Sequence, residues 1–287
     1  SWNVSALTNM SSMFREANSF NQPLSWNTAA VTNMSNMFYL NTAFNSALTF
    51  TTGAVTNMSG MFDGATAFNT APTFTSNALV TTMQYMFRGA IAFNKSLSFN
   101  TPAVTNMGSM FQNCTALNIA PTFNTSTVTD MNGMFRDAVA FNQPLSFNTA
   151  AVTNMSSMFY NATAFNQALT FNTSAVTNMS SMFRGASAFN QPLSFNTASV
   201  TTMSQMFYDA TAFNQNLGAL NVANVTNFTN FMSTKTAATF STANLDAIYN
   251  GWVTVQSSRV ITFGTAKYSA AGTAGRARRG TSLRCPR

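Results

Sequence analysis

Hydrophobic and polar residues recur along this chain in one pattern, repeated about every 24 residues. The repeated phrase is V-T-N-M-S-x-M-F-x-x-A-x-A-F-N-x-x-L-[ST]-F-N. Its first methionine column contains Met10, Met34, Met58, Met83, Met107, Met131, Met155, Met179 and Met203, with Phe228 in the tenth copy. The spacing is 24 throughout, with 25 only before Met83 and Phe228. A fixed period of roughly 20 to 50 residues is typical of solenoids, so the pattern predicts a repeat solenoid of ten coils.

Within one repeat, the apolar spacing predicts two short elements. In the third copy Met58, Met61, Phe62, Ala65 and Phe68 lie at offsets 0, 3, 4, 7 and 10, which is helical spacing with one apolar face. The segment 145–148 (L-S-F-N) alternates apolar and polar residues, as does a strand with one buried face. Each coil of this α/β solenoid is thus predicted to hold a short parallel strand and a short α- or 3₁₀-helix. We expect both methionine columns and both phenylalanine columns to be buried.

One polar column is as regular as the apolar ones. Asparagine follows the second aromatic position in every copy from Asn21 to Asn214. Identical amides stacked at strand spacing can hydrogen-bond along the axis of the stack. Alternatively, each side chain can bond the backbone of its own turn. Both interpretations make this column structural.

Charge is scarce and unevenly placed. Charged residues make up 7% of the chain, against roughly 25% in ordinary soluble domains. Five of the 13 basic residues are Arg276, Arg278, Arg279, Arg284 and Arg287. The repeats therefore present no basic face, and we expect no nucleic-acid partner. No apolar run approaches the ~18 residues of a membrane span, so we expect no such span in this chain.

The residues that usually carry catalysis are missing or scattered. The chain has no histidine, and its six acids are Glu16, Asp63, Asp130, Asp137, Asp209 and Asp246. Apart from Asp130 and Asp137 in the sixth copy, they fall in different repeats, so the repeats carry no recurring pair of carboxylates of the kind that a glycosidase needs. Cys114 occupies a column otherwise filled by alanine, which indicates a small buried thiol. We therefore expect no enzyme activity, no catalytic residue, no bound metal and no cofactor.

One column varies where the others do not. The position after the Met-Phe pair reads Arg15, Tyr39, Asp63, Arg88, Gln112, Arg136, Tyr160, Arg184 and Tyr208. A core column does not tolerate such changes, so we expect these side chains to face solvent. Arginine and tyrosine are enriched at interface hot spots. The column is therefore either a solvated face that confers solubility or a binding stripe.

The phrase V-T-N-M-S-S-M-F with A-F-N-Q-P-L-S-F resembles the BspA-like leucine-rich-repeat surface proteins. It is most similar to the branch found in mycoplasma and lactobacillus surface proteins, marine algae and large viruses. The opening W-N-V-S at residues 2–5 fits that branch, and the similarity extends over roughly residues 2–270. The resemblance implies a leucine-rich-repeat-like, right-handed solenoid on the outside of a cell or virion. It also implies adhesion or binding.

The sequence divides into three parts: solenoid repeats at 1–232, a capping region at 233–275 and a basic, disordered tail at 276–287. In the capping region Leu245, Ile248, Tyr249 and Trp252 have helical spacing, and Ser241 or Thr242 can cap the start of this helix. Family members usually continue into a hydrophobic closing strand, whereas this chain has R-R-G-T-S-L-R-C-P-R at 278–287. That departure suggests a frameshift, a truncation or an unusual terminus, and the start within a repeat suggests a fragment.

Two functions of different classes fit these observations. The first is a non-enzymatic surface module that binds a protein or glycan on a host or neighbouring cell, and is extracellular or on a cell or virion surface. The second is a structural fibre or filament subunit, in which solenoids associate end to end. Exposed strand edges and aromatic residues of the first coil would promote that stacking.

Overall fold

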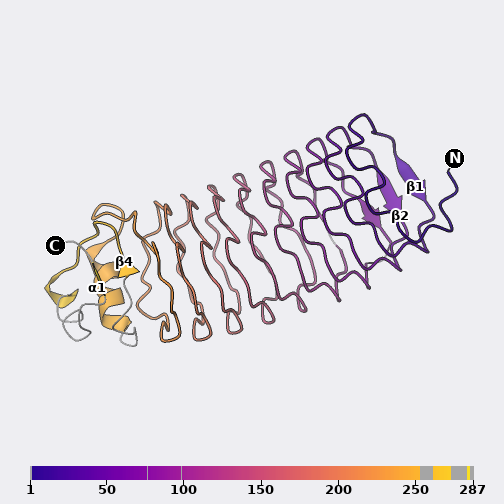
Figure 1. Ribbon diagram of the computed structural model, residues 1–287. Helices are drawn as coiled ribbons and strands as arrows, with labels where there is room; N and C mark the ends of the chain where they lie inside the picture. The colour runs from indigo at the N-terminus through magenta and orange to yellow at the C-terminus, as the bar shows by residue number, and fades with distance from the viewer. Residues whose placement is uncertain (1, 76, 98, 253–260, 273–282, 285–287) are drawn as a thin grey trace.

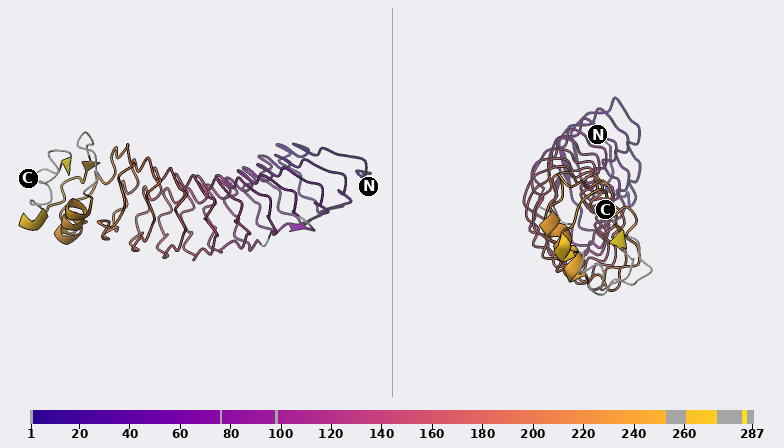
Figure 2. Two further views of the ribbon diagram at one scale, coloured as in Figure 1. Left: turned by 90° about the horizontal axis from the view of Figure 1, so that it is seen from below. Right: turned by 90° about the vertical axis from the view of Figure 1, so that its left-hand side faces the viewer.

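The repeats form coils that lie side by side in one elongated, curved rod (Figure 1; Figure 2). The computed structural model describes residues 2–75, 77–97, 99–252, 261–272 and 283–284. The first and the last described residues lie at opposite ends of the rod. Neighbouring coils belong to consecutive repeats and pair in parallel, so the chain has a repeat fold, as its period predicts.

A ladder of parallel backbone bridges keeps the coils in register. It joins Asn9, Asn33, Asn57, Thr82, Asn106, Asp130, Asn154, Asn178, Thr202 and Asn227 in turn. Beside this ladder, the Met10 N–H donates to the Asn33 carbonyl at 2.9 Å. The N–H of Thr32, the residue before Asn33, donates to the Thr8 carbonyl at 2.8 Å. Each coil thus satisfies backbone groups of both neighbours, as parallel strands do.

Within the described repeats, regular strands occur only in the first coils. β1 (Leu24–Trp26), β2 (Leu48–Phe50) and β3 (Thr73–Phe74) form a parallel sheet in that order. In a later copy, residues 145–148 keep the predicted alternation of buried and exposed side chains but form no strand. Side chains link the coils there, and the Thr149 hydroxyl donates to the Asn172 carbonyl at 3.0 Å. The prediction of a strand in every coil is therefore wrong.

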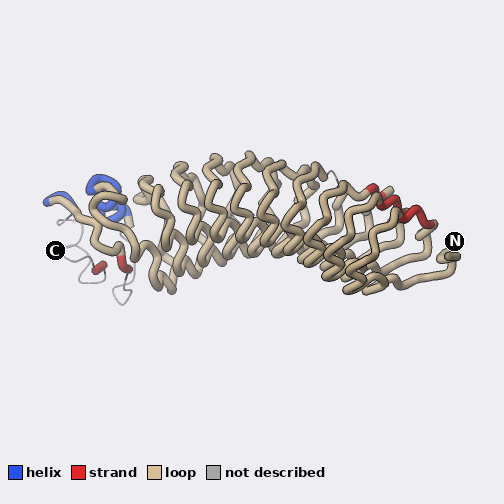
Figure 3. The backbone as a smooth tube through the Cα atoms, turned by 90° about the horizontal axis from the view of Figure 1, so that it is seen from above, coloured by secondary structure: helices blue, strands red, loops and turns tan. Residues whose placement is uncertain are grey.

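The predicted helix in each repeat is also wrong. In the described residues, helix occurs only beyond the repeats, and the M-S-x-M-F segments are consecutive turns (Figure 3). The Met13 N–H donates to the carbonyl of Met10 three residues back, whereas the Phe14 N–H donates to Met37 of the next coil. Because alternate N–H groups point to the neighbouring coil, the i to i−4 bonding of an α-helix cannot form.

Two columns with positive φ make these turns possible. The first contains Ser12, Asn36, Gly60, Tyr85, Ser109, Gly133, Ser157, Ser181, Gln205 and Asn230. The second contains Glu16, Leu40, Gly64, Gly89, Asn113, Asp137, Asn161, Gly185 and Asp209. Glycine and asparagine adopt left-handed backbone conformations most easily, which explains their frequency in both columns. The apolar side chains between them have helix-like spacing but point inward from turns.

The predicted core is confirmed. Both methionine columns and both phenylalanine columns are buried, except that Met13 and Phe20 of the first coil are half-buried. Aromatic rings of successive coils stack, and the Phe62 and Phe87 centroids lie 5.4 Å apart. The alanine column is buried from Ala65 to Ala210, whereas Ala17 of the first coil is half-buried. Asn41 replaces alanine in the second coil, and its side-chain amide is unpaired. The core is therefore a continuous stack along the rod.

The asparagine column links the coils along the axis, as the first alternative predicts, but through backbone N–H groups rather than from amide to amide. The Asn45 N–H donates to the Asn21 side-chain oxygen at 2.8 Å, and the same bond recurs along the column up to the Asn214 N–H. At the end of the column, the Ser241 N–H and the Asn244 amide donate to the Asn214 side-chain oxygen, both at 2.9 Å. The column thus ends on the region that covers the last coil.

That region contains α1 (Thr242–Gly251), which lies at the C-terminal end of the rod (Figure 1). Its predicted cap is confirmed for Ser241, whose side chain accepts from the Asn244 N–H. Its four predicted apolar residues, Leu245, Ile248, Tyr249 and Trp252, are fully buried. The Trp252 indole N–H also donates to the Leu217 carbonyl at 2.8 Å. The helix therefore shields apolar side chains at the end of the stack.

Lys235 also contributes to covering the end of the stack. It occupies the alanine column in the tenth copy and is almost fully buried. Its Nζ donates to the carbonyls of Ala210, Thr211 and Phe213 at 2.5, 3.1 and 2.7 Å. These carbonyls belong to the preceding coil. A buried ammonium thus satisfies backbone acceptors at the end of the array.

Beyond α1, β4 (Ile261–Thr262) pairs in parallel with β5 (Leu283–Arg284). The proposed tail at 276–287 otherwise lies outside the described residues, as does Cys285.

Candidate binding stripe

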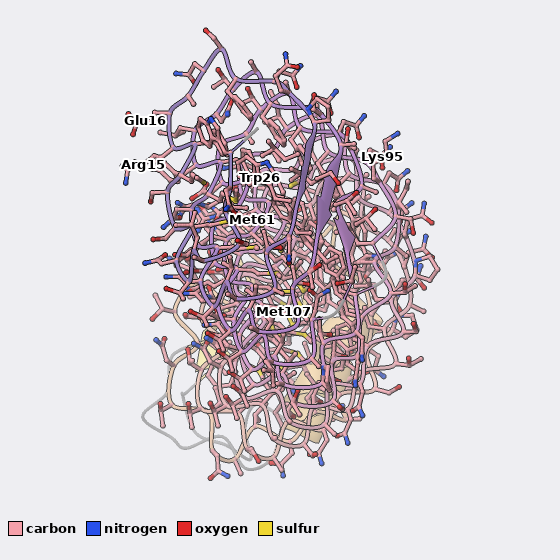
Figure 4. The ribbon with its side chains drawn as sticks, turned by 90° about the vertical axis from the view of Figure 1, so that its right-hand side faces the viewer. Arg15, Glu16, Trp26, Met61, Lys95 and Met107 are labelled. Atoms are coloured by element: carbon pink, nitrogen blue, oxygen red, sulfur yellow. The ribbon has the colours of Figure 1, made fainter. Side chains whose placement is uncertain are left out.

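The nine variable residues from Arg15 to Tyr208 form a row along one edge of the rod, here called the stripe. Each stripe residue lies one position before a residue with positive φ, and its N–H donates to a carbonyl three residues back. The flanking N–H groups bond the next coil, as Phe14 and Glu16 bond Met37 and Tyr39. This alternation keeps stripe residues of successive coils in register. Looking along the rod, Arg15 and Glu16 lie at one edge, Lys95 at the opposite edge, and Met61 and Met107 inside (Figure 4).

The stripe is less exposed than its sequence predicts. Arg15 is exposed, Asp63 is buried with 6% of its surface accessible, and the other members are half-buried. The expectation that the column faces solvent is therefore wrong at Asp63, whereas the other members keep part of their surface accessible. The reason is that its side chains cover one another across the coils.

Arginine and tyrosine side chains of successive coils stack along the stripe. The Arg15 guanidinium lies over the Tyr39 ring at 4.7 Å from the centroid. Arg136 and Arg184 lie over Tyr160 at 4.4 and 5.3 Å. Arg184 also lies over Tyr208 at 4.9 Å. Such cation–π contacts contribute about 0.5–1 kcal/mol each at exposed sites.

Carboxylates neutralise three of the four arginines. Arg88 forms a bidentate pair with Asp63, at 2.9 Å from Nε and 2.5 Å from Nη2. The hydrogen bond to Asp63 raises the pKa of Arg88 above its usual value, against the opposing effect of burial. Arg15 pairs with Glu16 at 3.1 Å and Arg136 with Asp137 at 3.2 Å. This part of the stripe therefore carries little net charge.

Several contributors to the stripe lie in the two positive-φ columns and were missed at the sequence level. Glu16 and Asp137 supply carboxylates, Tyr85 lies under the Arg88 guanidinium at 4.3 Å, and Gln205 accepts from Arg184 at 2.7 Å. The predicted helix places these positions elsewhere on the coil surface. The recurrence of Gly, Asn and Asp one residue after the stripe was the available signal for positive φ.

The described residues offer little for metal or thiol chemistry. No group of three or more His, Cys, Asp or Glu side chains among them could hold a metal ion. Cys114 is fully buried, as predicted; its thiol donates to the Phe87 carbonyl at 2.9 Å, and burial raises its pKa far above the usual value. No helix in the described part of the chain is long and apolar enough to cross a membrane.

Stacked coils, a continuous apolar core and a terminal helix define a repeat protein. The chain belongs to the family described as Mycoplasma protein of unknown function, DUF285, whose model matches residues 1–98, 49–146, 74–170 and 145–247. The overlap of these four matches reflects the internal repeat. This family is BspA-like, in agreement with the resemblance of the repeat phrase. No curated protein matches the chain.

Proposed function

We propose that the chain is a non-enzymatic binding module, exposed on a cell or virion surface, that attaches to a protein or glycan on a host or neighbouring cell. The observation that carries this proposal is the row of stacked, half-exposed arginine and tyrosine side chains along the rod. Both residue types combine a large contact surface with hydrogen-bonding groups, as binding surfaces require. Repetition of the row along the coils suits multivalent attachment, in which weak contacts add.

We also propose the finer description of the architecture and the family. The chain is a leucine-rich-repeat-like solenoid of ten coils at 1–232 with a capping region at 233–275. It belongs to the branch whose members occur in mycoplasma and lactobacillus surface proteins, marine algae and large viruses. The ladder of one residue per copy from Asn9 to Asn227 supports this coil count.

The test is a variant in which Arg136, Tyr160, Arg184 and Tyr208 are all changed to serine. Because these residues stack on one another, we expect it to fold with modestly reduced stability. Attachment to an array of surface glycans and extracellular proteins should fall strongly. The matched control changes Gln143, Gln167, Gln191 and Gln215 of another column to serine. Equal attachment by the two variants and the parent chain would reject the stripe as the binding surface.

A second candidate function, a filament subunit, is favoured by one observation. Trp2 has 64% of its surface exposed, although it stacks on Trp26 at a centroid distance of 5.9 Å. A hollow of about 420 Å³ lined by Trp2, Val4, Pro23 and Trp26 adjoins it. Negative-stain images of the purified chain separate the two functions. Rods of one length support the binding module, and long fibres with periodic joints support the filament.

A further inference from the structure

The arginines of the stripe are not equivalent. Arg88 takes its carboxylate from the stripe residue of the preceding coil, and Arg15 and Arg136 take theirs from the next residue in the chain. For Arg184 these two positions hold Tyr160 and Gly185. Among the described residues, no carboxylate lies within ion-pair distance of Arg184. It is therefore the one arginine in the row whose charge no neighbouring acid neutralises.

Neutral groups hold Arg184 in place. Its guanidinium lies between the rings of Tyr160 and Tyr208, and its Nη1 donates to the Gln205 side-chain oxygen at 2.7 Å. Gln205 adopts a φ of 55°, which glutamine rarely does. A guanidinium has five N–H donors, and this bond uses one of them. The stacked rings thus orient a cation whose remaining N–H groups can still donate to an anion.

Tyr208 adds a second feature at the same place. Its ring stacks on Arg184 on one side, and no other ring or guanidinium of the described chain stacks on it. The stripe position of the next coil is Ser233. Two bonds flank it, because the Phe207 N–H donates to the Phe231 carbonyl and the Asp209 N–H donates to the Thr234 hydroxyl. A serine side chain is too small to cover a phenol ring. Tyr208 is half-exposed, and Arg184 is the only cation or ring of the described chain that stacks on it, so we take the opposite ring face as the one open to a ligand.

We propose that Arg184, Gln205 and Tyr208 form a site for an acidic sugar within a polysaccharide. The carboxylate or sulfate of the sugar pairs with Arg184, and the C–H face of its ring lies on the free face of Tyr208. Aromatic faces are electron-rich and attract such C–H groups, while a guanidinium binds carboxylate and sulfate through paired N–H bonds. This inference rests on the proposed function and narrows it to one ligand class and one part of the stripe.

Asp209 is the nearest acid by register, one residue after Tyr208. It is exposed and forms no ion pair with Arg184. A solvated carboxylate there repels an incoming anion weakly. Changing Asp209→Asn should therefore strengthen binding of an acidic polysaccharide, and weaker binding by this variant would count against the site.

The experiment measures binding of the purified chain to immobilised dextran sulfate, polygalacturonate and uncharged dextran. We expect binding to at least one of the two acidic polymers, and the comparison shows whether sulfate or carboxylate is preferred. Arg184→Gln should weaken it roughly tenfold, since hydrogen bonds to charged groups are the strong ones. Tyr208→Ser should also weaken it, by a smaller factor. Circular dichroism checks that each variant is folded.

The matched control is Lys95→Gln. It removes one positive charge, as Arg184→Gln does, but from an exposed residue at the opposite edge of the rod (Figure 4), so binding should change less than about twofold. Equal losses in this control and in Arg184→Gln would overturn the inference, as would binding of uncharged dextran as strong as that of the acidic polymers. If the fourfold serine variant loses attachment to the array while Arg184→Gln keeps it, the stripe still binds but this site is wrong.

Discussion

Asn41 places an unpaired amide in the apolar core, and replacing it should stabilise the protein. Its column holds alanine in most copies, and Ala65 of the next coil is fully buried. Asn41 is also fully buried, and neither its Nδ2 nor its Oδ1 has a hydrogen-bond partner. Leaving a buried polar group unpaired costs about 1–3 kcal/mol. Asn41→Ala removes both unpaired atoms and restores the consensus residue.

The cost of the cavity left by this substitution is small. Truncation leaves a cavity of roughly 25 Å³, which at about 24 cal/mol per Å³ costs about 0.6 kcal/mol. The free energy of unfolding, measured by urea denaturation, should therefore rise by about 1–2 kcal/mol. The reverse change, Ala65→Asn, should lower it by at least as much. If Asn41→Ala is neutral or destabilising, the amide is satisfied in solution and the reasoning from unpaired groups fails at this position.

Three further changes test other parts of the structure. Phe135→Ala should lower the free energy of unfolding by about 3–5 kcal/mol, because Phe135 is fully buried in the ring stack. The control Val139→Ala, at a position that is 40% exposed, should change it by less than about 0.5 kcal/mol. Leu40 has a φ of 52°, so Leu40→Asn should raise the stability of the protein by about 1 kcal/mol. Gly64 in the same column has a φ of 72°, so Gly64→Ala should lower it. Thermal melts that give the opposite order would contradict the positive φ angles of this column. Burial lowers the pKa of Lys235 to about 8 from 10.5, so the unfolded chain binds this proton more tightly. The free energy of unfolding should therefore rise as the pH is raised from about 8 to 10.5, and Lys235→Met should remove that rise.

The period and the core were predictable from sequence because the same side chains recur at the same positions. Buried methionine and phenylalanine columns follow directly from that recurrence. The cap of α1 at Ser241 was predictable for another reason, the helical spacing of the apolar residues that follow it. The predicted helix failed because apolar offsets of 0, 3, 4 and 7 describe which side chains point inward, not where backbone N–H groups bond. Positive φ at residues such as Ser12 and Glu16 sends alternate N–H groups to the next coil.

The position of the stripe was predictable from its variable sequence, but the burial and the partners of its side chains were not. A variable column is typical of a surface, yet Asp63 is buried because Arg88 of the next coil covers it. Residues 24 or 25 positions apart come into contact only when the coils stack. The pattern of a single repeat therefore does not predict such contacts. The difference between Arg184 and Arg136 emerges only when the neighbours in adjacent coils are known.

The alternation of backbone bonds within and between coils has a mechanical consequence. Each coil is held by rows of hydrogen bonds to its neighbours, so a pull on the two ends of the chain loads the outermost coil first. That coil can detach without disturbing those behind it, and it releases roughly 80 Å of extended chain. A rod built in this way lengthens in steps under tension. An attachment made through it could stretch under load while the remaining coils stay folded.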